Sequence, residues 1–368
     1  MKSFITSIIA AVICVVALSK PATLQGLDKD SELRWTEASE LGLIAKMMPS
    51  SNPYWRVDTA AYHGFNSTES NQVRCGAGMA VAFRTDATEI RLRVRCRKPY
   101  TSMHNMRINS SGFDLYIKDA RGKWIFASNT CFVSEEDPDR VLITGMDGSE
   151  HECLLYFPIH TELKSCKIGV PASSNFEALP NPFRHRVVAF GSSFTHGSVA
   201  TRPGMSYLKQ LERRTGIQMI SLGCGGNGRL QPHFAEVLKD VEADAFLFDQ
   251  FSNSGAQLIR ERLFPFIEEL RSAHPGVPLI FQQTIRRESR NFSTLAESRE
   301  ADKMAVADSL MAIAVKKYPD VYYIKPSASH PSHEFFGDGT HPDSYGYWIW
   351  AQSIEKPLKR ILRRYKIK

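Results

Sequence analysis

The second half of this 368-residue chain alternates between short apolar runs and longer helical segments, and this rhythm restricts the possible folds more than any other feature. The apolar runs are expected to form strands at residues 186–191, 218–223, 245–249, 279–284 and 321–324. The helical segments lie at residues 207–215, 234–241, 257–273, 298–318 and 345–364. Such alternation predicts a parallel sheet covered by helices on both faces, with ligands bound at the carboxyl ends of the strands. We therefore expect an α/β domain over residues 184–368.

The first half follows a different pattern. Apolar and polar residues alternate along residues 79–85 and 89–96, with a plausible turn between them. Further candidate strands lie at residues 114–118, 124–127, 141–145, 151–158 and 165–170. Because no helical stretch of comparable length separates them, the pattern predicts an antiparallel, jelly-roll-like β-sandwich over residues 31–180. Residues 171–182 are rich in Pro, Ser and Asn and are expected to form the linker.

The first 19 residues differ from the rest of the chain. Lys2 precedes an apolar segment that is short for a membrane span, and Ala17-Leu18-Ser19 gives a small-x-small cleavage pattern. We expect residues 1–19 to be a secretory signal peptide, which predicts a secreted or periplasmic protein without stable membrane insertion after cleavage. An uncleaved anchor is the alternative. Ile13 before Cys14 is a poor fit to a lipoprotein cleavage site.

Composition excludes several classes of protein. With 43% hydrophobic and 23% charged residues, the chain is typical of a globular protein. Its net charge of +7 is partly concentrated in residues 356–368, which we interpret as the solvated face of a terminal helix, because export argues against nucleic acid as a partner. The cysteines beyond residue 19 show no zinc-site spacing, and some of them could be paired in an exported protein. They are Cys75, Cys96, Cys131, Cys153, Cys166 and Cys224.

A candidate nucleophile follows the first apolar strand of the second half. The run 187–190 suits a central strand, and Gly191 permits a sharp reversal at its end. Ser192 and Ser193 then stand where a helix can begin, and free backbone N–H groups there would hydrogen-bond an oxyanion. The alternative is that both serines only cap the helix.

A serine nucleophile needs a base, and the base needs an orienting partner. Asp338 and His341 are expected to share one loop after the fifth strand, because Gly339 and Pro342 make a continuous helix there unlikely to form. Three residues of separation allow the carboxylate to fold back onto the imidazole. Together with Ser193, they form a candidate triad.

Donors for an oxyanion hole are expected at the ends of two further strands. The glycine-rich stretch 222–228 follows the second strand, and Asn253 follows the third. Glycines let backbone N–H groups approach a bound carbonyl closely, and Asn253 offers a carboxamide donor. A nucleotide site is disfavoured, because the stretch lacks both the GxxxxGK[ST] lysine and the GxGxxG spacing.

The order Ser193, Gly226, Asn253, then Asp338 with His341 resembles the four blocks of the SGNH (GDSL-like) hydrolase superfamily. The match extends to a two-domain subgroup with a motif like that of residues 191–207 and a GxDLY signature in the preceding domain, here Gly112-Phe-Asp-Leu-Tyr116. The resemblance implies a flavodoxin-like, three-layer α/β/α catalytic domain. One departure is Ser192, where the superfamily's usual GDS motif has Asp.

The resemblance also implies roles for individual residues. Ser193 would be the nucleophile, His341 the general base and then acid, and Asp338 the residue that orients the imidazole. The N–H groups of Ser193 and Gly226 and the Asn253 side chain would form the oxyanion hole. No metal or organic cofactor is implied.

For the substrate, the resemblance implies acetylated poly- or oligosaccharides, as in bacterial carbohydrate esterases and acetylxylan esterases. The alternatives are a lipid or small-ester esterase of lysophospholipase-like type, a carbohydrate O-acyltransferase, and a glycan-binding protein with a relic site. His196 and Arg202 follow the nucleophile and are candidate substrate contacts or loop anchors. The oligomeric state stays open. Possible sugar platforms, each with a core or surface role as the alternative, are Tyr54, Trp55, Tyr100, His104 and Trp124.

Overall fold

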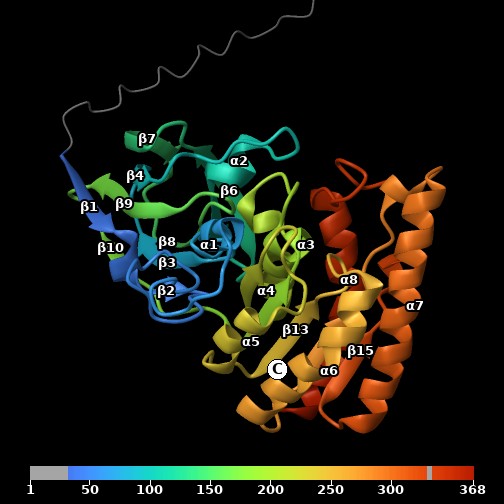
Figure 1. Ribbon diagram of the computed structural model, residues 1–368. Helices are drawn as coiled ribbons and strands as arrows, with labels where there is room; N and C mark the ends of the chain where they lie inside the picture. Colours follow the sequence, from blue (N-terminus) through green and yellow to red (C-terminus); the bar gives the residue numbers. More distant parts are fainter. Residues whose placement is uncertain (1–31, 330–333) are drawn as a thin grey trace, which may run out of the picture. The chain divides into compact units, whose positions relative to one another are not determined.

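The alternating segments of the first half form two antiparallel sheets. The computed structural model describes residues 32–329 and 334–368 (Figure 1). The first sheet has the strand order β1-β9-β4-β7, and the second has the order β10-β3-β8-β5-β6 with β2 paired to β3. The strands are β1 Leu33–Glu37, β2 Leu43–Ile44, β3 Ala80–Thr85, β4 Glu89–Cys96, β5 Gly112–Lys118, β6 Trp124–Cys131, β7 Glu136–Thr144, β8 His151–Tyr156, β9 Leu163–Pro171 and β10 Phe176–Ala178. An antiparallel β region therefore precedes the α/β region, as the sequence predicts.

The core of this β region is built from strands in which apolar and polar residues alternate. In β4, every second side chain is buried, and these residues pack against the apolar side chains of β3, β5, β8 and β9. The alternation arises because successive side chains of a strand point to opposite faces of the sheet. The buried set includes Phe83, Ile90, Leu115, Leu155 and Ile168.

Two features of the first half differ from the prediction. The segment 171–182, expected as a linker, contains β10, which pairs antiparallel with β3 because Phe176 packs against Phe83 with ring centroids 5.1 Å apart. Two short helices, α1 Ser67–Val73 and α2 Arg107–Ser111, interrupt the strands. The first begins at a capping box, in which the side chains of Asn66 and Glu69 each accept a hydrogen bond from the other's backbone N–H.

The second half forms a five-stranded parallel sheet of order β12-β11-β13-β14-β15. Its strands are β11 Arg184–Gly191, β12 Ile217–Gly223, β13 Ala245–Asp249, β14 Leu279–Gln282 and β15 Val321–Ile324. Its helices are α3 Ser193–His196, α4 Tyr207–Thr215, α5 Pro232–Lys239, α6 Ala256–Ala273, α7 Thr294–Lys317 and α8 Ser344–Arg364. Short 3-10 helices are η1 Ala38–Leu41, η2 Pro203–Met205, η3 Glu288–Arg290 and η4 Ser327–Ser329. The strand order is flavodoxin-like.

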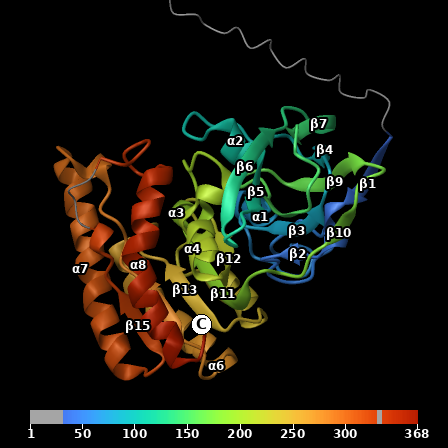
Figure 2. The ribbon, with the colours of Figure 1, turned by 180° about the vertical axis from the view of Figure 1, so that it is seen from behind.

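Helices cover both faces of the parallel sheet (Figures 1 and 2). One apolar core joins the sheet to α5, α6 and α7, and another joins it to α4 and α8. Along β11, Val188 and Phe190 belong to the first core, whereas Val187 and Ala189 belong to the second. A strand buried on both faces has no polar face to present, which explains its unbroken apolar run. The predicted three-layer arrangement is confirmed.

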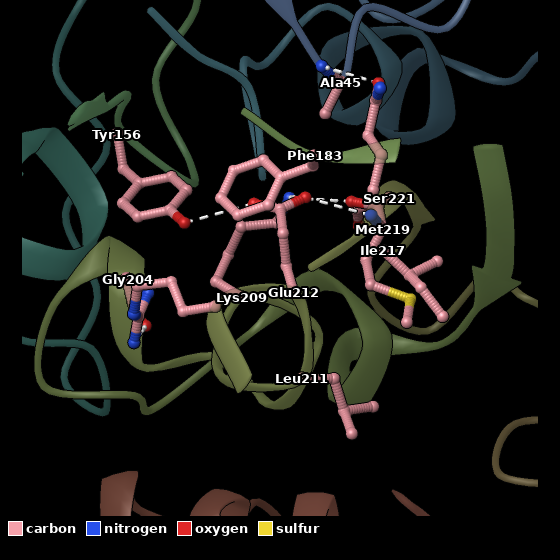
Figure 3. Close-up of polar contacts among 12 residues, drawn as sticks. Ala45, Tyr156, Phe183, Gly204, Lys209, Leu211, Glu212, Ile217, Met219 and Ser221 are labelled. Carbon is pink, nitrogen blue, oxygen red and sulfur yellow. Dashed lines mark hydrogen bonds and ion pairs between the residues drawn. The ribbon is translucent and has the colours of Figure 1, made fainter. Parts of the chain in front are cut away.

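Figure 3 shows a buried polar cluster where β8 meets α4 and β12. The ammonium of Lys209 donates to Glu212 Oε2 and to the Met219 carbonyl, both at 2.7 Å. Glu212 also accepts hydrogen bonds from the Met219 N–H and from the Tyr156 hydroxyl, at 2.9 and 3.1 Å. Burial lowers the pKa of Lys209, and the charge of Glu212 opposes that shift. The ion pair lies within α4, and the Tyr156 hydroxyl that donates to Glu212 connects the cluster to β8 in the first half.

Removing one partner of this pair should destabilise the fold strongly. Glu212→Ala leaves the Lys209 ammonium buried without its counter-charge, and we expect the free energy of unfolding to fall by about 3–5 kcal/mol. The control is Glu177→Ala, which breaks an ion pair between Arg84 and a carboxylate side chain that is 59% exposed, and which should cost about 1 kcal/mol or less. Urea unfolding measures both. Equal losses in the two variants would contradict this account.

Two further findings concern the whole described chain. Cys75, Cys96, Cys131, Cys153, Cys166 and Cys224 are free thiols in the part that the structure describes. Among the helices of that part, none is both long enough and apolar enough to cross a bilayer. Residues 1–19, expected to be a signal peptide, lie outside the described residues.

Candidate active site

The two serines after β11 have different hydrogen-bond partners, which bears on whether both only cap the helix. Ser192 is the N-cap of α3: its hydroxyl accepts a hydrogen bond from the Phe194 N–H at 3.1 Å and donates to Asp249 Oδ2 at 2.6 Å. Ser193 Oγ is thereby left free for another partner. Gly191 is required at the turn, because a Cβ there would lie 2.3 Å from Thr195 Oγ1.

Asp249 lies at the end of β13, beneath this turn, and is buried. Besides the Ser192 hydroxyl, its carboxylate accepts hydrogen bonds from the Ser192 N–H, Thr195 Oγ1 and Ser252 Oγ. Burial raises the pKa of Asp249, although the hydrogen bonds from Ser192 and Ser252 oppose that shift. The serine that departs from the GDS pattern is therefore held by a carboxyl from the neighbouring strand.

Ser193, His341 and Asp338 form one chain of hydrogen bonds. Ser193 Oγ lies 2.7 Å from His341 Nε2, and His341 Nδ1 lies 2.8 Å from Asp338 Oδ2. The carboxylate accepts a hydrogen bond from the Nδ1–H, so the lone pair of Nε2 faces the serine hydroxyl. This arrangement can remove the serine proton when the oxygen attacks a carbonyl carbon.

The loop that carries Asp338 and His341 holds the carboxylate in place. Asp338 Oδ1 accepts hydrogen bonds from the backbone N–H groups of Thr340 and His341, at 2.9 and 2.7 Å. Burial alone would raise the pKa of Asp338, but the hydrogen bonds from His341 and Thr340 outweigh it and lower the pKa. Gly339, at φ +74°, allows the turn. Asp338 therefore stays ionised beside the imidazole.

Three hydrogen-bond donors near Ser193 have no acceptor among the described residues. Asn253 Nδ2 is buried without a partner, and the backbone N–H groups of Ser193 and Gly226 are also unpaired there. A buried donor such as Asn253 Nδ2 is costly when it has no acceptor, so groups of this kind are found where a ligand completes them. All three residues line the same cavity, which fits an oxyanion hole.

The neighbouring glycines serve other purposes. A Cβ at Gly223 would lie 2.1 Å from the His196 nitrogen, and one at Gly228 would lie 2.5 Å from Gly191 backbone atoms. These two glycines therefore permit close packing of the turn. Gly225 and Gly226 both line the cavity, and Gly226 has a φ of +72°.

The cavity around Ser193 has a volume of about 570 Å³ and is walled by both halves of residues 33–368. Most of its lining residues have polar side chains, although apolar atoms make up the larger part of the cavity surface. The first half contributes Thr68, Asn71, Gln72, Cys75, Tyr100, Ser102, His104, Asn105 and His160. The guanidinium of Arg287 adds a positive charge beside Asn253 and donates to the Ser252 carbonyl at 2.7 Å.

His196, a sequence candidate for substrate contact, lines this cavity from α3. Its Nε2 donates to the Ile159 carbonyl at 3.0 Å, while its buried Nδ1 has no partner among the described residues. The ring of His160 lies against it with centroids 4.6 Å apart, and His160 Nε2 is likewise buried and unpartnered there. Burial, and secondarily the neighbouring His160, lowers the pKa of His196, so its ring is neutral.

Arg202, the other candidate, lies outside the cavity lining and instead binds the GxDLY motif. Its Nη1 donates to both oxygens of Asp114, at 2.9 and 2.7 Å, and to the Tyr116 hydroxyl. Asp114 also accepts the Gly204 N–H at 2.8 Å. A Cβ at Gly112 would lie 2.1 Å from the Ile108 carbonyl oxygen. The motif therefore anchors the loop that follows α3, and the contacts of Arg202 are those of the loop-anchor alternative.

Of the candidate sugar platforms, some line the cavity and others lie elsewhere. Tyr100 and His104 line the cavity, and His104 Nδ1 lies 3.9 Å from Asp338 Oδ2. Tyr54 is buried in the β-region core, and Trp55 donates to Glu162. Trp124 packs against an apolar core and is not among the residues that line the cavity.

Sequence reasoning missed the side chains that α1 brings to the cavity. Thr68, Asn71 and Gln72 lie on this helix. The capping pattern of Asn66 and Glu69 could have revealed the helix. No signal in the sequence placed it beside Ser193. Within the described residues, no group of His, Cys, Asp or Glu side chains is arranged to hold a metal ion.

Comparisons with known proteins agree with this geometry. The profile of the GDSL-like lipase/acylhydrolase family matches residues 184–359, and the GxDLY profile, described as the N-terminus of SGNH hydrolase-type esterases, matches residues 33–176. No curated protein sequence matches the chain.

Solved structures share the fold over nearly the full chain. A protein of Bacteroides ovatus ATCC 8483 described as GDSL-like lipase is 34% identical, with a TM-score of 0.86 over 90% of this chain and 98% of that one. The salicylyl-acyltransferase SsfX3 from a tetracycline biosynthetic pathway is 17% identical, with a TM-score of 0.68 over 91% and 96% of the two chains. A family two carbohydrate esterase of Cellvibrio japonicus is 12% identical, with a TM-score of 0.61 over 90% and 98%. The chain therefore belongs to the GDSL-like lipase/acylhydrolase family of SGNH hydrolases, with a GxDLY region before its α/β domain.

Proposed function

We propose that this protein is a serine esterase that removes small acyl groups, acetyl above all, from carbohydrates. The observation that carries the proposal is the hydrogen-bonded chain of Ser193, His341 and Asp338 beside the unpartnered Asn253 Nδ2. Acyl transfer requires a nucleophile, its base and a hydrogen-bond donor that is free to bind the oxyanion, and these groups surround one cavity.

The reaction takes place in two steps. Ser193 Oγ attacks the ester carbonyl while His341 Nε2 takes its proton, and the oxyanion accepts hydrogen bonds from Asn253 and the N–H groups of Ser193 and Gly226. The tetrahedral intermediate collapses as His341 returns the proton to the departing alcohol, which leaves an acyl-serine. Water, deprotonated by His341, then attacks the acyl carbon, and collapse releases the acid and restores Ser193.

The cavity lining supports a hydroxyl-rich alcohol. Most of the described lining residues have polar side chains, which can hydrogen-bond sugar hydroxyls. The unpartnered nitrogens His196 Nδ1 and His160 Nε2 are groups that a sugar hydroxyl would complete. Structures with this fold include carbohydrate esterases, which supports the same substrate class. Export to a secreted or periplasmic location, where polymeric glycans are met, is part of the proposal.

Acetate release from a panel of acetylated glycans tests the function. We expect release from acetylated xylan or xylo-oligosaccharides and falling rates along p-nitrophenyl esters from acetate to decanoate. Rates that rise with acyl length would favour a lipid esterase instead. Because a salicylyl-acyltransferase shares the fold, the products are also analysed with an unacetylated sugar present, and acetyl transfer to that sugar in place of acetate release would favour an acyltransferase.

The oxyanion assignment makes a separate prediction. Asn253→Ala removes one donor from the developing oxyanion, and we expect kcat for p-nitrophenyl acetate to fall by about 10²- to 10³-fold. The control is Asn291→Ala, which removes an exposed carboxamide that contacts Arg286. Stopped-time assays of both variants at saturating substrate measure the effect. Unchanged kcat in Asn253→Ala would remove this residue from the oxyanion hole.

A further inference from the structure

We infer that Gln72, from the first half of the chain, is a positioning residue that aims the Gly226 N–H into the oxyanion hole. The inference rests on the proposed serine esterase function. It gives helix α1 a part in the chemistry beyond walling the cavity.

Gln72 holds the oxyanion loop by both atoms of its carboxamide. Its Nε2 donates to the Gly225 carbonyl at 3.0 Å, and its Oε1 accepts from Asn227 Nδ2 at 3.2 Å. Asn227 Nδ2 also donates to the Gly225 carbonyl, at 3.0 Å. The Gly225 carbonyl is therefore fixed by two donors.

The Gly225 carbonyl and the Gly226 N–H belong to the same peptide plane. In a trans peptide these two groups point in opposite directions, so an anchor on the carbonyl also sets the direction of the N–H. This peptide lies between Gln72 and Ser193. A Cβ at Gly225 would be 3.2 Å from Gln72 Nε2 and 3.4 Å from Ser193 Cβ. The carbonyl is bound on the Gln72 side, and the N–H is left for a substrate oxygen.

Gly226 gives the loop little stiffness of its own. Its φ of +72° is one that glycine adopts without the strain other residues meet, and glycine restricts its neighbours least. The hydrogen bonds to the Gly225 carbonyl therefore supply the orientation, and Gln72 takes part in them both directly and by accepting a hydrogen bond from Asn227. Hydrogen bonding at a carbonyl also polarises the same amide and strengthens its N–H as a donor.

Gln72 is itself rigidly placed. The buried guanidinium of Arg56 donates to the Gln72 and Cys75 carbonyls at the end of α1, and to the Ser221 and Gly223 carbonyls of β12. At the other end of the helix, Glu69 accepts from Gln231 Nε2 at 3.0 Å. The helix is thus bound to the strand before the oxyanion loop and to a residue after it. Its position relative to Ser193 is set by backbone contacts rather than by the Gln72 side chain alone.

Two substitutions separate positioning from folding. Gln72→Met keeps the length of the side chain but removes its donor, and Gln72→Glu places an acceptor against the Gly225 carbonyl. For both we expect kcat for p-nitrophenyl acetate to fall by about 10- to 100-fold, less than removal of a whole oxyanion donor would cost, with KM changed by about twofold or less. Affinity for phenylboronic acid, which forms a tetrahedral adduct with the serine, should fall by a similar factor.

The control is Ser70→Ala, which alters the same helix outside the cavity lining and should leave kcat unchanged. Thermal unfolding shows whether each variant is folded under assay conditions. If both Gln72 variants are folded and keep kcat and boronate affinity while Ser193→Ala is inactive, the role of Gln72 is overturned and the esterase function stands. A loss of kcat without a loss of boronate affinity also overturns it. An active Ser193→Ala variant would instead overturn the proposed function itself.

Discussion

Replacing Ser193 with alanine should lower kcat for p-nitrophenyl acetate by about 10⁵- to 10⁶-fold, because the acyl-serine can no longer form. The imidazole of His341 would lose the hydroxyl that lies 2.7 Å from its Nε2. The fold should keep its stability, since Ser192 and not Ser193 supplies the hydroxyl that caps α3. Initial rates at high enzyme concentration, together with thermal unfolding, measure the two effects.

Ser192→Ala is the matched contrast. It removes a hydroxyl one residue earlier that binds Asp249 and the Phe194 N–H, so it should cost about 1 kcal/mol in unfolding free energy while leaving a serine that can be acylated. Phenylmethanesulfonyl fluoride should add its sulfonyl group to the wild type and to Ser192→Ala but not to Ser193→Ala, as read by intact mass. Labelling of Ser193→Ala at the wild-type rate would show that another residue is the nucleophile.

Ser193 and His341 are 148 residues apart, but each has a local sequence signal and both follow strands of the same parallel sheet, so the core of the site could be predicted. Asp338 and His341 are three residues apart, so a single turn brings them together. Ser193 follows a strand whose apolar run could only be buried on both faces. The carboxyl ends of parallel strands meet along one edge of the sheet, so the sequence order of the segments was enough to bring Ser193, Gly226 and Asn253 to one cavity.

The contacts between the two halves could not be predicted, because the residues that they join do not belong to one sheet whose topology would place them together. Arg202 follows the nucleophile closely enough to suggest substrate binding, yet its partner Asp114 is 88 residues away. Gln72 lies 153 residues before Gly225, on a helix whose composition differs little from that of any polar surface helix. Contacts between the two halves depend on how the halves pack against each other. No periodicity or motif in the sequence predicts that packing.

The two serines at the start of α3 have different partners in the structure. Capping and nucleophilic attack each need one hydroxyl at the start of α3. Ser192 points to Asp249 and the backbone, and Ser193 points to His341. The structure therefore assigns the cap to Ser192, and Ser193 remains the candidate nucleophile.

Asp338→Asn should lower kcat by about 10⁴-fold while leaving the loop intact. The asparagine oxygen can still accept the N–H groups of Thr340 and His341, but the carboxamide nitrogen would now face His341 Nδ1 as a donor. The imidazole would then carry its proton on Nε2, where it cannot accept the Ser193 proton.

His104 offers no replacement for the lost carboxylate, because its nearest nitrogen lies 3.9 Å from Asp338 Oδ2 and it would add another donor. The control is Asp343→Asn, which alters the N-cap of α8, where the retained oxygen can still accept the Gly346 N–H. We expect near wild-type kcat for this control and unchanged thermal unfolding for Asp338→Asn. A loss of kcat below about tenfold in folded Asp338→Asn would mean that His341 keeps its tautomer without the carboxylate, and Asp338 would then have no part in the proton transfer.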